Sequence, residues 1–348
     1  MRIQPFRGET LLAIFKFRNP APLLEHLEIY GYPLDHISRL PRDFLGCHVP
    51  SLRFLIWGGS LLPAPSELYN LTHPSLYDAD EASTSLHVVL RVLSSAPLLE
   101  YLSISILDAG VVQGPTPVHD IRLDFLRHLH LASGAALSQA IPHFKAPQLK
   151  ELSLTLPSYV GVPTIADLLP SDSYPLIMET TSMEFYIGPG DSAIELKGKG
   201  IKVRVNTLFP DFEATFNFFS NMTIFPIAQI TRLMLRRIVR PLIARMGEFT
   251  NLEMLDLMYC QEDAEVLSAL SPSPQSVSPV PCPRLIVVVV AFYYPTTHVV
   301  DSFKQMVRLR KEAENPLVNV NFRYFDGIHE MLDIEELNGW LGQAPPLE

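Results

Sequence analysis

The sequence predicts an α/β fold, an irregular leucine-rich-repeat solenoid, or horseshoe, with a parallel inner sheet and outer helices. Two observations predict it. The pattern Pro-x-Leu-x-x-Leu-x-Leu recurs along the chain, and segments with apolar residues at helical spacing lie between its copies. A unit of one strand and one helix cannot bury its apolar side alone, so neighbouring units must stack on one another.

The repeat pattern occurs in eight segments, with substitutions tolerated at each place. These are residues 22–29, 50–57, 97–104, 124–131, 147–154, 228–235, 250–257 and 283–290. Counted between first leucine positions, most neighbouring copies are 22 to 33 residues apart, and two gaps measure 47 and 81 residues. Leucine-rich repeats have a period of about 20–29 residues. We interpret the shorter gap as one unit with a loop insertion. The longer gap leaves room for one or two decayed copies, around residues 183–185 and 203–205.

Each repeat is expected to build one strand, because Leu-x-Leu has the period of a strand with one buried face. The first leucine of the pattern lies on the turn before that strand. Apolar spacing predicts outer helices at residues 83–93, 262–270 and 299–314, with one more strand at 318–322. Proline-rich loops are expected at residues 63–74, 114–117, 157–175 and 271–279.

These elements predict a single solenoid domain over residues 1–348. Residues 1–20 are expected to form an N-terminal cap or a truncated repeat, and residues 21–325 the repeats. Residues 326–348 carry apolar side chains among acidic ones, which fits a C-terminal cap, since a terminal repeat leaves an open sheet edge.

Composition narrows the class of partner. The chain has 27 Lys and Arg against 37 Asp and Glu, a formal net charge of −10, which repels nucleic acid. The longest apolar run, 285–292, is too short to span a bilayer, so no membrane association is expected. Cys47, Cys260 and Cys282 are far apart in the sequence, and the first fifteen residues show no secretory signal. These features predict an intracellular protein, cytoplasmic or nuclear.

The predicted binding surface is the concave face of the sheet. Residues beside and between the last two leucines of each repeat point to that face, because successive side chains of a strand alternate. The candidate partner-binding residues are His26, Glu28, Tyr30, Phe54, Tyr101, His128, His130, Glu151, Arg232, Met234, Arg236, Met254, Asp256 and Met258. The alternative is that these positions form a solvated or loop-covered side of the sheet without a binding role.

Motifs for chemistry are weak. Residues 329–333, His-Glu-Met-Leu-Asp, end in Asp where a zinc protease helix needs His. His128 and His130 share a strand face without a third ligand nearby in sequence, and the glycine pairs at 188–190 and 198–200 are expected to be turns. We therefore predict no catalytic residues, no metal and no cofactor, and a protein-protein interaction module that is not an enzyme. Two alternatives stay open: an α/β hydrolase or transferase with an unrecognised site, and a non-functional truncated product.

Three copies of the repeat share a longer pattern. Ala-Pro-x-Leu-Glu-x-Leu occurs at 21–27 and 96–102, and Ala-Pro-x-Leu-Lys-x-Leu at 146–152, while Met-Val-Arg-Leu-Arg at 306–310 precedes a predicted strand. Together they resemble the repeat region of fungal F-box proteins. The resemblance implies repeats that hold the protein to be ubiquitinated by a cullin-RING ubiquitin ligase. An F-box would add the Skp adaptor as a partner, but no F-box is evident before the first repeat at residue 22.

Overall fold

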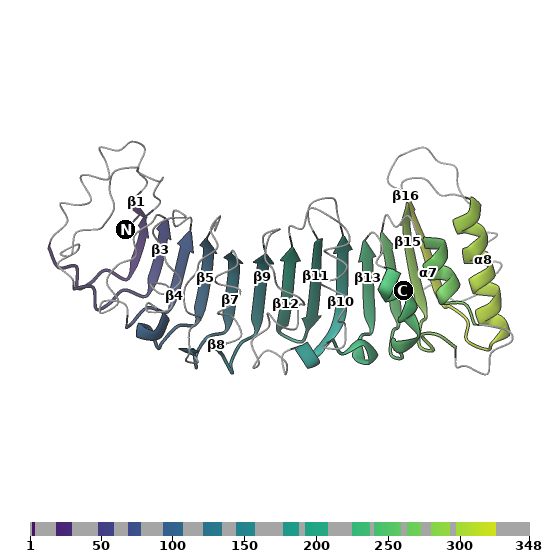
Figure 1. The fold of residues 1–348 in the computed structure, drawn as a ribbon, viewed down its shortest axis with the longest axis horizontal. Helices are drawn as coiled ribbons and strands as arrows, with labels where there is room; N and C mark the ends of the chain where they lie inside the picture. The colour runs from purple at the N-terminus through teal and green to yellow at the C-terminus, as the bar shows by residue number, and fades with distance from the viewer. Residues whose placement is uncertain are drawn as a thin grey trace, which may run out of the picture. The chain divides into compact units, whose positions relative to one another are not determined.

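The computed structural model shows a mixed α/β protein with a largely parallel sheet and few helices (Figure 1). It describes residues 2–3, 19–29, 48–58, 69–77, 93–106, 121–133, 144–156, 177–187, 192–207, 225–236, 240–258, 263–272, 280–292 and 297–324. The chain divides into two compact units, each described by itself below. Unit 1 holds residues 1–176, 202–209 and 217–221, and unit 2 holds residues 177–201, 210–216 and 222–348.

Unit 1 is built on a parallel sheet whose neighbouring strands follow one another in chain order. Its strands are β1 (Arg2–Ile3), β2 (His26–Ile29), β3 (Phe54–Gly58), β4 (His73–Tyr77), β5 (Tyr101–Ile106), β7 (His128–Ser133), β9 (Glu151–Leu156) and β12 (Ile201–Thr207). Two short strands, β6 (Ile121–Arg122) and β8 (Phe144–Lys145), pair in parallel as a second sheet.

The leucines of the repeats align from strand to strand on the buried face of this sheet. Leu102, Leu129 and Leu152 lie directly beside one another and are fully buried. Burying one such side chain stabilises the fold by about 1.5–3 kcal/mol, and a slip of one residue would turn the whole set toward solvent. The repeat therefore fixes the register as well as the strand.

Backbone hydrogen bonds at the strand entrances repeat the same register. The Glu25 carbonyl accepts the N–H groups of Arg53 and Phe54 at 2.9 and 3.0 Å. The Glu100 carbonyl accepts those of Arg127 and His128 in the same way, at 2.8 and 3.1 Å. The first residues of neighbouring strands are therefore aligned with one another.

Strand β4 corrects one sequence prediction. We expected a loop over residues 63–74, but His73 and Pro74 begin this strand. Residues 69–76 match the repeat with Pro74 in place of the second leucine, and Leu71 and Leu76 are buried as the pattern requires. A proline-rich segment predicts a loop. Proline also lacks the N–H that a residue of a central strand donates. The 47-residue gap therefore contains a further strand.

Unit 2 also has a sheet, with neighbours in the order β11-β10-β13-β14-β15-β16 (Figure 1). Its strands are β10 (Thr180–Ile187), β11 (Ser192–Gly198), β13 (Arg232–Arg236), β14 (Met254–Met258), β15 (Val287–Phe292) and β16 (Asn319–Tyr324). Strands are present at both places where decayed copies were predicted: β10 includes residues 183–185 and, in unit 1, β12 includes residues 203–205.

The expectation of an all-parallel sheet is wrong at β11, which pairs antiparallel with β10. Only residues 188–191 separate these two strands, and a parallel connection needs a dozen or more residues. The predicted turn at 198–200 is confirmed: residues 199 and 200 follow β11, and Gly200 has a φ of +73°. The other predicted turn, 188–190, lies outside the described residues.

The helices of unit 2 cover the apolar side of its sheet. They are α6 (Arg240–Ala244), α7 (Asp263–Ala269), α8 (Thr297–Glu312) and the short 3₁₀ helices η6 (Ile227–Gln229) and η7 (Met246–Glu248). Helices α7 and α8 confirm two predicted outer helices, and β16 the strand predicted after them. Leu267 of α7 and Met306 of α8 are fully buried, as is Val288 of β15. The third predicted helix, 83–93, falls almost wholly outside the described residues, as do both predicted caps.

A buried arginine joins α8 to the segments beside it. The Arg310 guanidinium donates to the carbonyl oxygens of Leu270, Pro281 and Cys282 at 3.2, 2.9 and 3.0 Å, and also to the Asn315 side chain. Burial lowers the pKa of Arg310, although the accepting oxygens provide partners for the charge. Leu270 follows the C-terminus of α7, where a helix dipole favours a cation.

Cys282 is packed beside this arginine as a free thiol. Its Sγ donates to the Met246 carbonyl at 3.1 Å, and burial raises the pKa of the thiol to about 12. Cys47 and Cys260 lie outside the described residues. In the part of the chain that the structure describes, no helix is long and apolar enough to cross a membrane.

Candidate functional site

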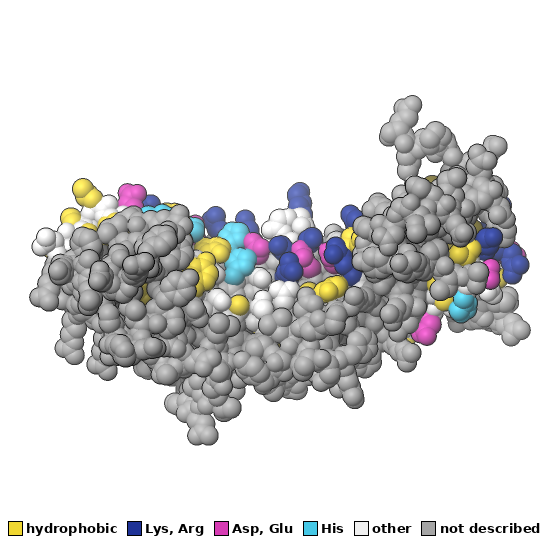
Figure 2. Space-filling model, turned by 90° about the horizontal axis from the view of Figure 1, so that it is seen from above, with side chains coloured by type: hydrophobic (Ala, Val, Ile, Leu, Met, Phe, Trp, Pro, Cys, Tyr) yellow, Lys and Arg dark blue, Asp and Glu magenta, His cyan; other side chains and the backbone are white. Residues whose placement is uncertain are grey.

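The face of each sheet opposite the leucines carries the polar residues of the strands, and we call it the polar face. In unit 1 it has two rows running across the strands. The first row is His26, Phe54, His73, Tyr101, His128, Glu151 and Lys202. The second row is Glu28, Ile56, Ser75, Ser103, His130, Ser153 and Arg204. Figure 2 shows histidine side chains beside hydrophobic ones on this face.

Six rings of these rows stand next to one another as a ring column: His26, Phe54, His73, Tyr101, His128 and His130. The His26 and Phe54 centroids are 5.6 Å apart, and those of Phe54 and His73 are 4.6 Å apart. Tyr101 lies 6.0 Å from His73, 6.2 Å from His128 and 5.4 Å from His130. The contacts are therefore continuous from β2 to β7.

The register of the sheet creates this column. Phe54, His73, Tyr101 and His128 each begin their strands, and parallel pairing brings these first positions side by side. Adjacent strands lie about 4.8 Å apart, close to the distance at which aromatic rings stack. The angle between ring planes is 30° for His26 and Phe54, 26° for Phe54 and His73, and 12° for His73 and Tyr101.

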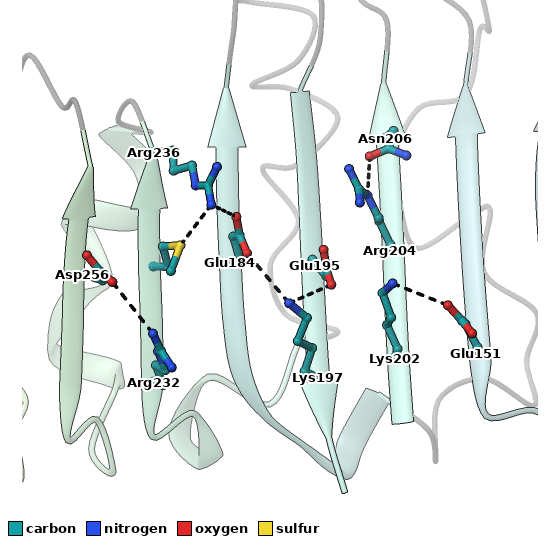
Figure 3. A network of polar contacts seen from close by, with 11 residues as sticks. Glu151, Glu184, Glu195, Lys197, Lys202, Arg204, Asn206, Arg232, Arg236 and Asp256 are labelled. Atoms are coloured by element: carbon teal, nitrogen blue, oxygen red, sulfur yellow. Dashed lines mark hydrogen bonds and ion pairs between the residues drawn. The ribbon is translucent and has the colours of Figure 1, made fainter. Parts of the chain in front are cut away.

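An ion-paired glutamate ends the ring column. Glu151 contacts His128 Nδ1 at 3.2 Å. It also lies 3.5 Å from Lys202 Nζ (Figure 3). Burial raises the pKa of Glu151, but the His128 hydrogen bond and the charges of His130 and Lys202 outweigh it, so the net shift is downward. Glu151 is therefore a carboxylate at neutral pH. At the other end of the column, His26 Nε2 lies 2.9 Å from Glu28.

Two histidines of the column are held in the neutral form. Burial lowers the pKa of His73, opposed by Glu100 and assisted by His128. Burial also lowers the pKa of His130, where Glu151 opposes the shift and His128 and Lys202 add to it. At neutral pH these imidazoles are uncharged, and their ring nitrogens can each donate or accept according to the tautomer.

The polar face of unit 2 carries a charged cluster of six residues: Glu184, Glu195, Lys197, Arg232, Arg236 and Asp256. Lys197 lies 2.9 Å from Glu195 and 4.0 Å from Glu184, which also pairs with Arg236 at 3.0 Å (Figure 3). Without Lys197 and Arg236, the glutamates would repel each other, because they face one another across β10 and β11. The three positive and three negative charges of this cluster balance.

The predicted residues of unit 2 lie on this face but differ in exposure. Arg232 is about half exposed and lies 3.9 Å from Asp256, whose side chain is only 6% exposed. Met234, Met254 and Met258 are partly buried, and Met234 Sδ accepts a hydrogen bond from Arg236 at 3.7 Å. Asp256 is too buried to be a direct contact for a partner in this state of the molecule.

The structure brings most of the predicted binding residues together within their units. His26, Glu28, Phe54, Tyr101, His128, His130 and Glu151 line the polar face of unit 1. Arg232, Met234, Arg236, Met254, Asp256 and Met258 line that of unit 2. Tyr30 lies outside the described residues.

Sequence reasoning missed several residues of both groups. His73 sits on the repeat that Pro74 disguised, and Lys202 precedes the decayed copy at 203–205. The strand pattern around residue 183 gave the signal for Glu184. Glu195 and Lys197 lie on β11, an antiparallel strand that the repeat pattern does not predict.

Among the described residues, no group of three or more His, Cys, Asp or Glu is placed to hold a metal ion. Residues 329–333 lie outside them. The chain was also compared with known proteins: no family model, no curated protein and no solved structure matches it. The candidate site is therefore argued from its own geometry.

Proposed function

We propose that this chain is a leucine-rich-repeat protein that binds another protein through the polar face of its sheet and catalyses no reaction. The observation that carries the proposal is the ring column of unit 1, which presents stacked aromatic and imidazole side chains from successive strands. Aromatic residues dominate the energetics of protein interfaces. A row of them on a rigid sheet loses little conformational entropy when a partner binds.

The exposure of the column supports a binding role. Phe54 is 41% exposed, although burial of a phenylalanine is strongly favourable, and Tyr77, which lies opposite Gly58 at the end of β4, is 38% exposed. The apolar residues of the opposite face are almost completely buried by comparison. A partner that covered these rings would remove their apolar surface from water, and the binding free energy would become more favourable.

The repeat-like register within each unit supports the leucine-rich-repeat assignment. It agrees with the resemblance to the repeat region of fungal F-box proteins. We propose an intracellular location for the chain, which the free Cys282 thiol supports. On this proposal the polar face holds a protein to be ubiquitinated. Recruitment of the Skp adaptor would require an F-box in addition to the repeats.

The proposal is tested by affinity capture of the tagged chain with two matched variants. In the face variant, Phe54 and Tyr101 are changed to Ser. In the control variant, Leu23 and Phe125 are changed to Ser; both are exposed apolar residues of the same unit, at 89% and 48%, on turns that lead into strands. Proteins bound by the wild type are identified by mass spectrometry, and circular dichroism checks that both variants fold.

We expect a partner that the control variant retains and the face variant loses. Recovery of Skp and cullin with that partner would support membership of a ubiquitin ligase, and recovery of the partner alone would support a free-standing binding module. Equal binding by all three proteins, or loss in the control variant alone, would contradict the proposed surface.

A further inference from the structure

The ring column presents edges to its surroundings. Because neighbouring rings of the first row stack at interplanar angles of 12° to 30°, their faces are occupied by one another. An incoming molecule meets the ring edges, which are the positive part of the aromatic quadrupole, and the imidazole nitrogens. Negative hydrogen-bond acceptors complement such edges, whereas cation-π contacts and stacked nucleobases need free ring faces.

The net charge of the two rows depends on the protonation of their histidines. Within the two rows of unit 1, the carboxylates Glu28 and Glu151 are matched by Lys202 and Arg204. Arg204 is exposed and donates from Nε to Asn206 at 2.9 Å (Figure 3). Protonation of His73 and His130 would therefore give the two rows a net positive charge.

We propose that the polar face of unit 1 binds an acidic peptide segment of its protein partner, whose carboxylates lie along the ring column, and that this binding takes up protons and strengthens as the pH falls. This inference rests on the proposed protein-binding function and names the chemistry of the partner. Glutamate and aspartate side chains supply both the charge and the acceptors that the ring edges and imidazoles complement.

Proton uptake follows from the groups that surround the histidines. In the free protein, burial lowers the pKa of His73 and His130, so both are neutral near pH 7. Glu100 and His128 act on His73, and Glu151, His128 and Lys202 act on His130. A bound carboxylate adds a negative charge beside each imidazole and raises its pKa. By linkage, a ligand that raises these pKa values binds more tightly at lower pH.

A nucleic acid is the other anionic polymer to consider. Its phosphates could accept from the same imidazoles, but its bases would find no open ring face on the first row. The chain's net charge of −10 also opposes a continuous phosphate backbone. A short acidic segment held against the rows, where two carboxylates face two cations, avoids most of that repulsion.

The test is fluorescence anisotropy of the full chain with three probes: a labelled peptide of alternating Glu and Ser, the same peptide with Gln for Glu, and labelled oligothymidylate. We expect the Kd for the Glu peptide to fall about tenfold from about pH 7.5 to about pH 5.5. The His73→Gln, His130→Gln double variant should lose most of this dependence. The matched control is His48→Gln, an exposed histidine of the same unit outside the ring column. Circular dichroism at each pH checks folding.

Each outcome decides the inference. Binding of the Glu peptide that depends on pH, on the two histidines and on charge supports it. Equal binding of the Gln peptide, a Kd independent of pH, stronger binding of oligothymidylate, or no binding at all overturns it. If the face variant loses a captured partner while no Glu peptide binds, the proposed function stands and only the acidic chemistry fails. If the capture also shows no dependence on the face, the proposed function fails too.

Discussion

Replacing Arg310 by Met should strongly destabilise unit 2. The change keeps a long apolar side chain but removes the donors to three carbonyl oxygens and to Asn315. A hydrogen bond to a charged group contributes roughly 1.5–3 kcal/mol, and buried oxygens left unpaired lose their hydration in addition. Relief of the arginine's own burial cost offsets part of the loss. We expect a net decrease of about 3–5 kcal/mol in the free energy of unfolding, because several hydrogen bonds to one charged group are lost together.

The assay combines urea unfolding, followed by far-ultraviolet circular dichroism, with hydrogen exchange read by mass spectrometry. Exchange is needed because a chain with two compact units need not unfold in one step. Peptides of α7 and α8 should lose protection in the variant. The control is Arg308→Met, two residues earlier on the same helix, where the exposed side chain lies 3.8 Å from Glu312. That change should cost at most about 0.5 kcal/mol.

The reasoning is refuted if the two variants unfold alike and α7 and α8 keep equal protection. Arg310→Lys gives a further check, because an ammonium keeps the charge but lacks the planar fork that reaches several carbonyls at once. We expect Lys to recover less than half of the lost stability. Full recovery by Lys would show that the charge alone matters.

Three further predictions concern other parts of the fold. Gly198→Ala should destabilise the β10–β11 pair by about 1–3 kcal/mol, because the new Cβ would lie 2.5 Å from the Glu179 carbonyl oxygen. The control is Gly247→Ala, whose new Cβ would have no atom within 4 Å. The melting temperatures of the two variants are compared. Thr180→Val should cost about 1–2 kcal/mol in urea unfolding, because the buried hydroxyl donates to the Ile177 carbonyl at 2.7 Å; an unchanged midpoint would contradict this. Because the folded-state pKa values of His73 and His130 are lowered, the stability that they contribute is complete above the unfolded value of 6.5 and is lost as the pH falls below it. On acidification, the melting temperature of the His73→Gln, His130→Gln variant should therefore fall less than that of the wild type. An equal fall in the two proteins would contradict this prediction.

Much of the polar face follows from alternation within the repeats. Tyr101, His128 and Glu151 were predicted from their place before a leucine, and the parallel register sets them side by side. The same rule did not find His73, because a proline stands where the leucine should be. Pro74 interrupts the sequence pattern of β4, but pairing with β3 on one side and β5 on the other holds this strand in the sheet.

Other features have no periodic signal at all. Strand β11 runs antiparallel, and its residues Glu195 and Lys197 enter the charged cluster only through pairing with β10. A charged residue in a predicted outer helix is expected to be exposed, yet the Arg310 side chain is fully buried. The oxygens that accept its hydrogen bonds come from segments up to 40 residues away in sequence, so helical periodicity could not predict its burial.

By itself, the sequence determined where most strands begin, which side of each strand is buried and which polar residues share the opposite face, because these properties depend on local periodicity. Only the tertiary structure decided that the rings of five strands stand in contact, that Glu151 is shared by His128 and Lys202, and that Arg310 caps buried carbonyls. The physical reason is that distances between strands, and the burial that shifts the pKa values of His73 and His130, exist only after distant segments have packed together.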